Sequence, residues 1–582
     1  MTRTQSVNRL VPMAIGIRNS GLLRIWIPLC FLILISSCTS TTEEPEILIE
    51  QTSVNSIDEL SEFGRAVTRG QKVTLANLTN RRPLIPADIY RNLNHPAIPP
   101  SHEDLATFAW LEFISLVAKE GNERGLPGGS FLQSGSNPNQ ILNWQTYHHR
   151  VELFPYRPKG QAKAPTPWNS TPKYDMSYKD ARDSVQPYPV PYNEYTNLDE
   201  ASQIAQNLLF FPSNPNTMNP VNDHQALYEA KVNKISWNYV NNNYTTLNNI
   251  TPSIYPDGIT LPDSTVHLKA TWKPLASIPE NERYKYHIST GIYYEGSDSN
   301  PVARTKQFAL IGLHVIHKTP NYPAFIYATF EHMDNLKGKT YYVPTYEAIQ
   351  YALPDSVPTY NGDSLHSPNP FPSDYVNNPY AEPNGNRINL VNYNVRNARG
   401  AQVIPIGGGQ TVIGVPVSSP PTTNRMVGNV NAHVLRLMKS LPGFDKNFVW
   451  QYYFLKGVQG VPTNNESAPD FYLTNNVTES SIPGLELFRG GQSISFDLPQ
   501  KPLQIRRNEL NVMDLKQGGD YQFCMGGCQG CHGISKRLNG FDFSFLYFGA
   551  ASGYSPDVIG LKQREELNKL LKKYDLSKRR SD

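Results

Sequence analysis

Three of the five cysteines lie within eight residues near the C-terminus, in the segment FCMGGCQGCHG that spans Phe523 to Gly533. Within it, Cys528, Cys531 and His532 have the spacing C-x-x-C-H. Two thiols at this spacing can each add to one vinyl group of a porphyrin, and the adjacent imidazole can then bind the iron. The segment therefore predicts one covalently attached haem c, with His532 as the proximal iron ligand.

Other chemistry fits parts of the same segment. With Cys524 the spacing becomes C-x3-C-x2-C, which matches the iron–sulfur triad of radical enzymes that use S-adenosylmethionine, although those triads open a cytosolic barrel. A zinc site made of Cys524, Cys528, Cys531 and His532 lacks the usual spacing of paired zinc knuckles. A redox disulfide leaves the histidine unexplained. The residues favour haem c, with zinc and a redox disulfide as alternatives and the role of Cys524 open.

The sixth ligand of such an iron is not evident, because neither methionine nor histidine follows His532. The candidates lie upstream and are Met513, His314, His317 and His332. Methionine ligation would raise the reduction potential and suit electron transfer, whereas an open position would admit peroxide or another small ligand.

The N-terminus has the pattern of a bacterial secretory signal. A purely basic lead precedes the apolar run Ile25 to Ile35, and Ser36, Ser37 and Cys38 follow. This run is too short to span a bilayer, and small residues before a cysteine resemble the lipobox of bacterial lipoproteins, whose cysteine is acylated. We therefore expect lipidation of Cys38 and a place in the cell envelope, anchored in the outer membrane and facing the periplasm.

The composition supports an exported, strand-rich protein. The 582 residues include 48 prolines and 33 tyrosines, and only 18% are charged. Because 53 basic residues nearly balance 50 acidic ones, without a basic block, we expect no nucleic-acid partner. The predicted class is α+β, with a β-rich main body, a few amphipathic helices, long irregular loops and a small C-terminal haem c segment.

The chain divides into four predicted parts. Residues 1–37 form the signal peptide, 38–85 a polar tether, 86–500 the β-rich main domain and 501–582 the haem-attachment segment. Apolar periodicity predicts several helices and strands. The helices are 102–119, 197–211, 424–441 and 560–574, and the strands include 266–272, 308–317, 324–333, 448–458 and 471–477.

The strands 308–317 and 324–333 are predicted to form an antiparallel hairpin at the centre of a sheet. Alternation places His314 on one face, and His317 and His332 on the other. At about 3.3 Å per residue, His317 and His332 would lie roughly 25 Å apart, so one iron could not bind both.

The adjacent pair His148 and His149 points to two different sides of any strand or helix. Nothing nearby in the sequence completes a metal site, so we expect these two histidines to be surface or interface residues.

Five segments resemble, in the same order, a group of exported bacterial proteins labelled cytochrome c family proteins. They are VHLKATW (266–272), GLHVIHKTP (312–320), ATFEHMDN (328–335), YLTNNVTE (472–479) and CQGCHG (528–533), and the likeness covers roughly 90–550. The resemblance implies haem attachment at Cys528, Cys531 and His532. It assigns no reaction and no substrate.

The resemblance also implies that the hairpin motif around His317, Glu331, His332 and Asp334 is a feature of the group. The predicted function is a lipid-anchored monohaem c-type cytochrome that transfers electrons in the periplasm to a redox partner protein. One alternative is a peroxidase-like haem c oxidoreductase with Glu331 and His332 as acid/base groups. Another is a surface lipoprotein without haem, whose tyrosine-rich loops bind a glycan or peptide.

Overall fold

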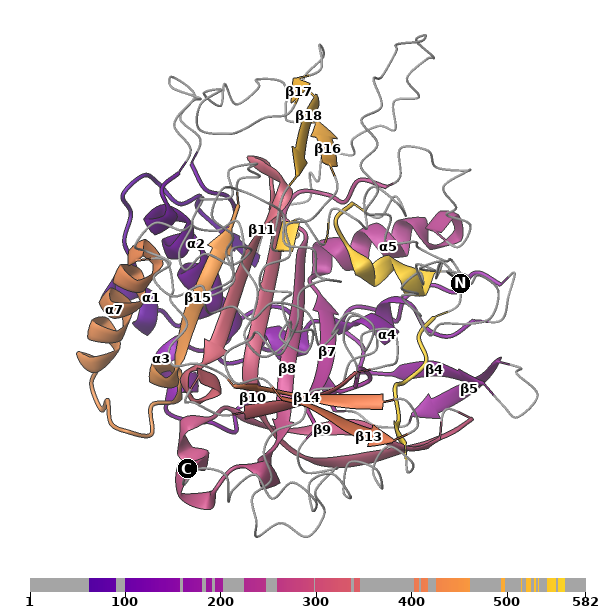
Figure 1. The fold of residues 1–582 in the computed structure, drawn as a ribbon. Coiled ribbons are helices and arrows are strands. Elements are labelled where there is room, and N and C mark those ends of the chain that lie inside the picture. The colour runs from indigo at the N-terminus through magenta and orange to yellow at the C-terminus, as the bar shows by residue number, and fades with distance from the viewer. Residues whose placement is uncertain are drawn as a thin grey trace, which may run out of the picture.

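The computed structural model describes a set of ranges between Glu62 and Gly560. They are 62–90, 100–157, 161–179, 185–190, 194–201, 225–247, 259–297, 299–336, 340–345, 402–407, 410–416, 425–460, 493–497, 514–515, 520–524, 528–529, 532, 542–550 and 553–560. These ranges contain helices and a large, mostly antiparallel sheet (Figure 1), which confirms the α+β, β-rich class. Among the described residues no helix is long and apolar enough to cross a membrane.

A nine-stranded sheet organises the described chain, with the strand order β15-β11-β10-β8-β7-β3. Strand β9 pairs with the N-terminal half of β10, and β6 and β19 pair with β9. Its strands are β3 (His148–His149), β6 (Thr196–Asn197), β7 (Leu227–Val232), β8 (Val266–Pro274), β9 (Ile288–Ser297), β10 (Asn300–Thr319), β11 (Tyr322–His332), β15 (Tyr453–Gln459) and β19 (Ile559–Gly560). The 20-residue strand β10 pairs with β8, β9 and β11 and is the centre of the sheet.

The predicted central hairpin is confirmed. Strands β10 and β11 are antiparallel, and their register runs from Gly312 opposite Glu331 to Thr319 opposite Tyr322. A register shift between Leu310 and Gly312 interrupts the pairing of β10 with β8. Such a bulge changes which face of the sheet the following side chains reach.

The helices are α1 (Leu75–Thr79), α2 (His102–Leu116), α3 (Phe131–Gly135), α4 (Arg150–Leu153), α5 (Lys234–Leu247) and α7 (Arg425–Lys439). Short 3-10 helices are η2 (Asn143–Thr146), η4 (Leu275–Ser277), η5 (Glu280–Lys285), η6 (Met333–Leu336), η10 (Val449–Tyr452) and η13 (Phe545–Ala550). Four smaller sheets pair β1 (Phe63–Gly64) with β2 (Ile85–Pro86), β4 (Tyr174–Lys179) with β5 (Val185–Val190), β14 (Gln410–Pro416) with β12 (Thr340–Thr345) and β13 (Gln402–Gly407), and β18 (Asp520–Cys524) with β16 (Ser493–Asp497) and β17 (Asp514–Leu515).

Two of the predicted helices are confirmed, α2 and α7. Helix α2 begins at a capping box, in which the Ser101 hydroxyl accepts the Asp104 amide proton at 3.1 Å and Asp104 accepts the Ser101 amide in return. The helix predicted over 197–211 is wrong at its start, since Thr196 and Asn197 pair as strand β6 with β9. Tertiary pairing overrides local capping preference there. The helix predicted over 560–574 lies almost wholly outside the described residues.

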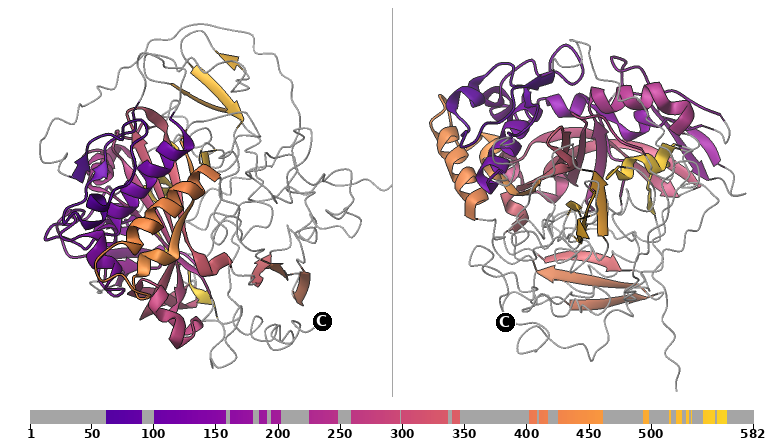
Figure 2. Two further views of the ribbon diagram at one scale, coloured as in Figure 1. Left: turned by 90° about the vertical axis from the view of Figure 1, so that its left-hand side faces the viewer. Right: turned by 90° about the horizontal axis from the view of Figure 1, so that it is seen from above.

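Two hydrophobic cores lie on opposite faces of the central sheet. On one face α2 and α7 pack side by side against β15 and β11 (Figure 2), and Phe113 stacks on Phe330 with ring centroids 4.1 Å apart. On the other face Phe325 and Tyr327 pack with α5 and with Phe543 near the C-terminus. Both faces are therefore buried, which explains why the sheet strands carry long apolar runs.

The predicted part boundaries need two corrections. Phe63, Leu78 and Ile85 are buried in the core under α2, so the folded body begins at or before Glu62 rather than at residue 86. Near the C-terminus, Phe543 belongs to the core on the α5 face and β19 pairs with β9, so residues 542–550 and 553–560 are integral to the body. Buried apolar side chains at both ends decide these boundaries, which composition alone did not reveal.

The buried Glu62 carboxyl gives a test of how the N-terminal segment is held. The Tyr147 hydroxyl donates to Glu62 at 2.6 Å, and burial raises the pKa of Glu62 from 4.5 to about 7. The free energy that this raised pKa contributes is fully present below pH 4.5 and is lost as the pH rises through 7. Glu62→Gln should remove this pH dependence and stabilise the fold at pH 8 by up to about 3 kcal/mol, measured by urea unfolding. If the free energy of unfolding depended on pH equally in the wild type and in Glu62→Gln, this prediction would be contradicted. The control is Glu123→Gln, at an exposed position.

Candidate functional site

Strand register collects the polar residues of three sequence motifs on one face of the central sheet. Lys269 of β8, His314 of β10 and Thr329 of β11 lie side by side in one row, and the neighbouring row contains His267 and Tyr327. The His314 Nδ1 atom lies 3.0 Å from the Thr329 hydroxyl. This is the face opposite α2, because alternate residues of a strand point to opposite sides.

The C-terminal segment docks at the end of this face. Cys528, Gln529 and His532 have helical backbone, and Gln529 is fully buried. The Gln529 side-chain amide donates to the carbonyl oxygens of Phe325 at 2.9 Å, Gly460 at 3.2 Å and Ala324 at 3.3 Å. Its backbone N–H donates to the Gln459 side chain at 2.7 Å. One glutamine therefore fixes the cysteine segment to the ends of β11 and β15.

The His532 imidazole is held in one orientation. Its Nδ1 lies 2.9 Å from the Phe543 carbonyl oxygen, and the Tyr327 and Phe545 rings lie 5.0 and 4.9 Å from the imidazole, centroid to centroid. A carbonyl oxygen only accepts, so Nδ1 carries the proton, and in the neutral ring Nε2 carries the lone pair. Metal-bound histidines usually have this arrangement, with the second nitrogen donating to a carbonyl. The described residues of the segment thus fit an iron ligand at His532.

The Phe543 carbonyl is itself positioned by a strained turn. Asp542 and Phe543 have φ angles of 43° and 63°, and Phe325 beneath them has 63°. For residues other than glycine such angles cost of order 1–3 kcal/mol each. The buried Lys318 ammonium lies 2.8 Å from the Asp542 carboxylate, which also accepts the Leu261 amide at 2.7 Å. An ion pair and a backbone hydrogen bond therefore hold the turn in this conformation.

His267 is next to His532 but is engaged elsewhere. Its Nε2 lies 2.9 Å from the Ser236 hydroxyl, and its Nδ1 lies 3.3 Å from the Ser544 hydroxyl. Burial, with a smaller contribution from the neighbouring His532, lowers the pKa of His267 to about 3. His267 is therefore a neutral, hydrogen-bonded core histidine.

His317 cannot share an iron with His532. It lies on the α2 face of the sheet, where its Nδ1 is 2.5 Å from the Glu112 carboxylate and its ring contacts Phe63 and Phe108. Burial raises the pKa of Glu112, and the His317 charge opposes this rise. The sheet separates His317 from the C-terminal segment, so this candidate for the sixth ligand is wrong.

His332 and Glu331 also have separate surroundings. The His332 Nε2 lies 3.0 Å from the Lys285 carbonyl, its Nδ1 accepts the Asp334 amide at 3.1 Å, and its ring stacks on Tyr286 at 3.8 Å. Both ring nitrogens are thus used by the backbone. Glu331 is buried on the opposite face of β11. The two cannot act together as acid and base, because neighbouring strand residues point apart.

Of the remaining candidates, His314 shares the face of His532. It lies one row beyond Tyr327, at about 7 Å along the strand, so it stays a candidate for the sixth ligand. Met513, Cys531 and Cys38 lie outside the described residues. Cys524 is the last residue of β18, where it pairs with Ser493.

In the described part of the chain, no group of three or more His, Cys, Asp or Glu side chains could hold a metal ion. The alternative zinc site needs Cys531, which is outside that part, so zinc stays a prediction.

The prediction of a surface position for His148 and His149 is wrong, because both are fully buried. His148 stacks on Trp168 at 4.7 Å, and His149 lies 3.2 Å from the Asp199 carboxylate. They border a buried polar network around Lys231, whose ammonium donates to three backbone carbonyls. These contacts satisfy polar groups in the core.

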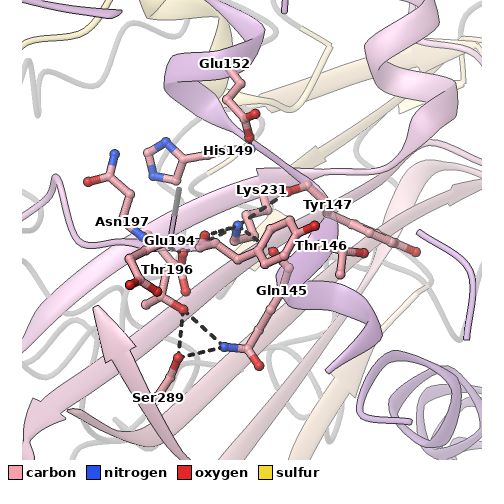
Figure 3. Close-up of polar contacts among 12 residues, drawn as sticks. Gln145, Thr146, Tyr147, His149, Glu152, Glu194, Thr196, Asn197, Lys231 and Ser289 are labelled. Atoms are coloured by element: carbon pink, nitrogen blue, oxygen red, sulfur yellow. Dashed lines mark hydrogen bonds and ion pairs between the residues drawn. The ribbon is translucent and has the colours of Figure 1, made fainter. Parts of the chain in front are cut away.

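Figure 3 shows one part of this network, in which the Gln145 amide donates to Thr196 and Ser289, both at 3.1 Å. Lys231 lies nearby, with the Gln145 and Tyr147 carbonyls as acceptors. The contacts of Gln145 with Thr196 and Ser289, and of Lys231 with the Tyr147 carbonyl, link different elements of the fold, which gives the network a structural role.

Several site residues were not recognised from the sequence. Gln529 stands inside the C-x-x-C-H motif but has no role in its chemistry, and Asp542 lies in an aromatic run. Lys318 was visible only as part of the hairpin motif. Its place directly after buried His317 in an alternating strand is the one signal that a charged group would enter the opposite core.

Comparison with protein-family models, with curated proteins and with solved structures found no match to this chain. The resemblance to cytochrome c family proteins therefore depends on the five sequence segments alone.

Removing the Gln529 amide tests the docking of the C-terminal segment. Gln529→Leu should destabilise the fold by about 1–3 kcal/mol, because the carbonyls of Phe325 and Gly460 lose a buried donor. The measurement is the urea unfolding midpoint. Gln451 also donates to two carbonyls but is half-buried, so Gln451→Leu should cost clearly less. Equal losses of stability in Gln529→Leu and Gln451→Leu would contradict the role of Gln529 in holding the C-terminal segment to the sheet.

Proposed function

We propose that this chain is a monohaem c-type protein that transfers electrons, with haem attached through Cys528 and Cys531 and its iron bound by His532. The observation that carries the proposal is the hydrogen bond from His532 Nδ1 to the Phe543 carbonyl. Because this bond assigns the proton to Nδ1, Nε2 is the nitrogen that would bind a metal, and two cysteines in the attachment spacing precede His532 in the sequence.

The haem would supply one-electron chemistry, and the chain's residues would tune it. The Phe543 carbonyl makes the His532 imidazole a stronger electron donor to a bound iron, which favours the oxidised state. Tyr327 and Phe545 flank the imidazole and limit its contact with water. Electron transfer suits such a rigid, aromatic setting better than substrate turnover does.

The enzyme alternative is weakened because its two acid/base candidates have opposite surroundings. The His332 nitrogens face the Lys285 carbonyl and the Asp334 amide, and Glu331 points to the other side of β11. We propose His314 or Met513 as the sixth ligand and a redox protein as the partner.

A pyridine haemochrome spectrum of the periplasmic or envelope fraction tests the proposal. The wild-type chain should contain one haem with two thioether bonds. Cys531→Ser should abolish normal attachment, because one vinyl group loses its thiol, whereas Cys524→Ser should leave attachment intact. A wild-type chain without covalent haem rules the proposal out, and loss of haem in Cys524→Ser would favour the four-ligand metal site.

We also propose that the chain is anchored in the outer membrane, facing the periplasm, by acylation of Cys38. The support is the basic and apolar lead of residues 1–37 followed by Ser37 and Cys38. Cys38→Ser should move the protein from the detergent phase to the aqueous phase in phase partitioning and abolish labelling with radioactive fatty acid. Labelling that persists in this variant would show that the anchor is elsewhere.

A further inference from the structure

We propose that Lys318 and Asp542 form a latch that positions the His532 imidazole. The pair lies at the contact between β10 and the C-terminal segment, 224 residues apart in the chain. The inference rests on the proposed function only where it concerns the iron, because the latch itself is a property of the polypeptide.

The latch acts through the backbone of one residue. Lys318 Nζ is 2.8 Å from Asp542 Oδ2, and the side chains are only 5% and 1% exposed. Phe543 follows Asp542 directly, and its carbonyl accepts from His532 Nδ1 at 2.9 Å and from the Tyr327 hydroxyl at 3.5 Å. A displacement of Asp542 therefore moves the Phe543 carbonyl oxygen that holds the imidazole.

Backbone strain is concentrated around this pair. The described part of the chain has four residues other than glycine with positive φ, namely Ser264, Phe325, Asp542 and Phe543. Ser264 donates its amide to the Lys318 carbonyl at 2.7 Å, and Lys318 Nζ lies 5.7 Å from the centroid of the Phe325 ring. The Phe325 and Phe543 rings are 6.3 Å apart. All four strained residues thus meet at the latch.

Strain of this kind persists only where surrounding contacts hold it, and it gathers at functional sites. A buried ion pair adds little net stability to a fold, because the cost of desolvating both charges offsets their attraction, and apolar residues of similar size would stabilise the fold as well. The directional contact between Lys318 and Asp542 holds the turn at Asp542 and Phe543, which apolar packing would leave free to relax. Lys318 and Asp542 are therefore positioning residues for His532, and they touch no reacting atom.

Gln529 holds the other end of the same segment independently. It binds the ends of β11 and β15 through four hydrogen bonds, none of which involves Lys318 or Asp542. The segment can therefore stay attached to the sheet when the latch is broken, and the two contributions can be measured separately.

The test compares the full chain with Lys318→Met, made in a host that attaches haem c. Lys446→Met is the matched control, because Lys446 is exposed and lies 5.5 Å from the Tyr284 ring, away from the segment. Lys318→Met leaves the Asp542 carboxylate buried without its cation. Hydrogen exchange of the Leu261 amide, which donates to Asp542, should then become about a hundredfold faster or more.

A second readout separates positioning from stability. In the haem-loaded Lys318→Met variant the midpoint potential should become more positive. The reason is that a misplaced Phe543 carbonyl makes the imidazole a weaker electron donor. Lys318→Met/Asp542→Asn has no unpaired buried charge, so it should recover wild-type thermal stability and keep the altered potential.

The Asp542→Gly variant tests whether a positive φ at this residue is enough by itself to position the His532 imidazole, since glycine adopts positive φ without strain. It should resemble Lys318→Met, because it lacks the carboxylate. A wild-type exchange rate and a wild-type potential in Lys318→Met, or in Asp542→Gly, would overturn the latch. Haem content of the wild type reports on the proposed function alone. If the haem content is zero, the exchange rate of the Leu261 amide in Lys318→Met still decides for or against the latch.

Discussion

The pleat of one strand, β10, is the constraint on which the rest of the molecule depends. Between β8 and β11 its register is fixed on both sides, so the face that each side chain reaches is fixed too. Leu313, Val315 and His317 enter the core under α2, whereas His314, Ile316 and Lys318 enter the opposite core. A slip by one residue would exchange the partners of every one of them, which makes the hairpin register the decisive feature of the fold.

Burial on both faces forces the ionisable side chains of His317 and Lys318, near the end of β10, to find partners in distant parts of the chain. His317 meets Glu112 of α2, 205 residues earlier in the sequence, and Lys318 meets Asp542, 224 residues later. An isolated charge in such a core would be prohibitively costly. The C-terminal segment therefore completes the sheet and supplies a countercharge that the sheet needs. This is why the described residues of the C-x-x-C-H segment pack against the main body.

The requirement that buried polar groups have partners also determines the contacts of the N-terminal half. His148, His149 and Lys231 are all buried, and each has a backbone carbonyl or a carboxylate as a polar partner. These networks tie α4, β3, β6 and β7 together, and their bonds run across elements rather than along them. The polar face of the sheet differs in one respect, because there a strained turn and an ion pair converge on a single imidazole.

The sequence by itself determined the elements whose signals are local. Apolar periodicity predicted helix α2 and the two strands of the β10–β11 hairpin, and the cysteine spacing defined the candidate attachment site. Tertiary structure decided which residues meet. It alone separated His317 from His532, paired Lys318 with Asp542 and folded Glu62 into the core. The reason is physical: strand period and capping depend on neighbours in sequence, whereas burial and charge pairing depend on segments hundreds of residues apart.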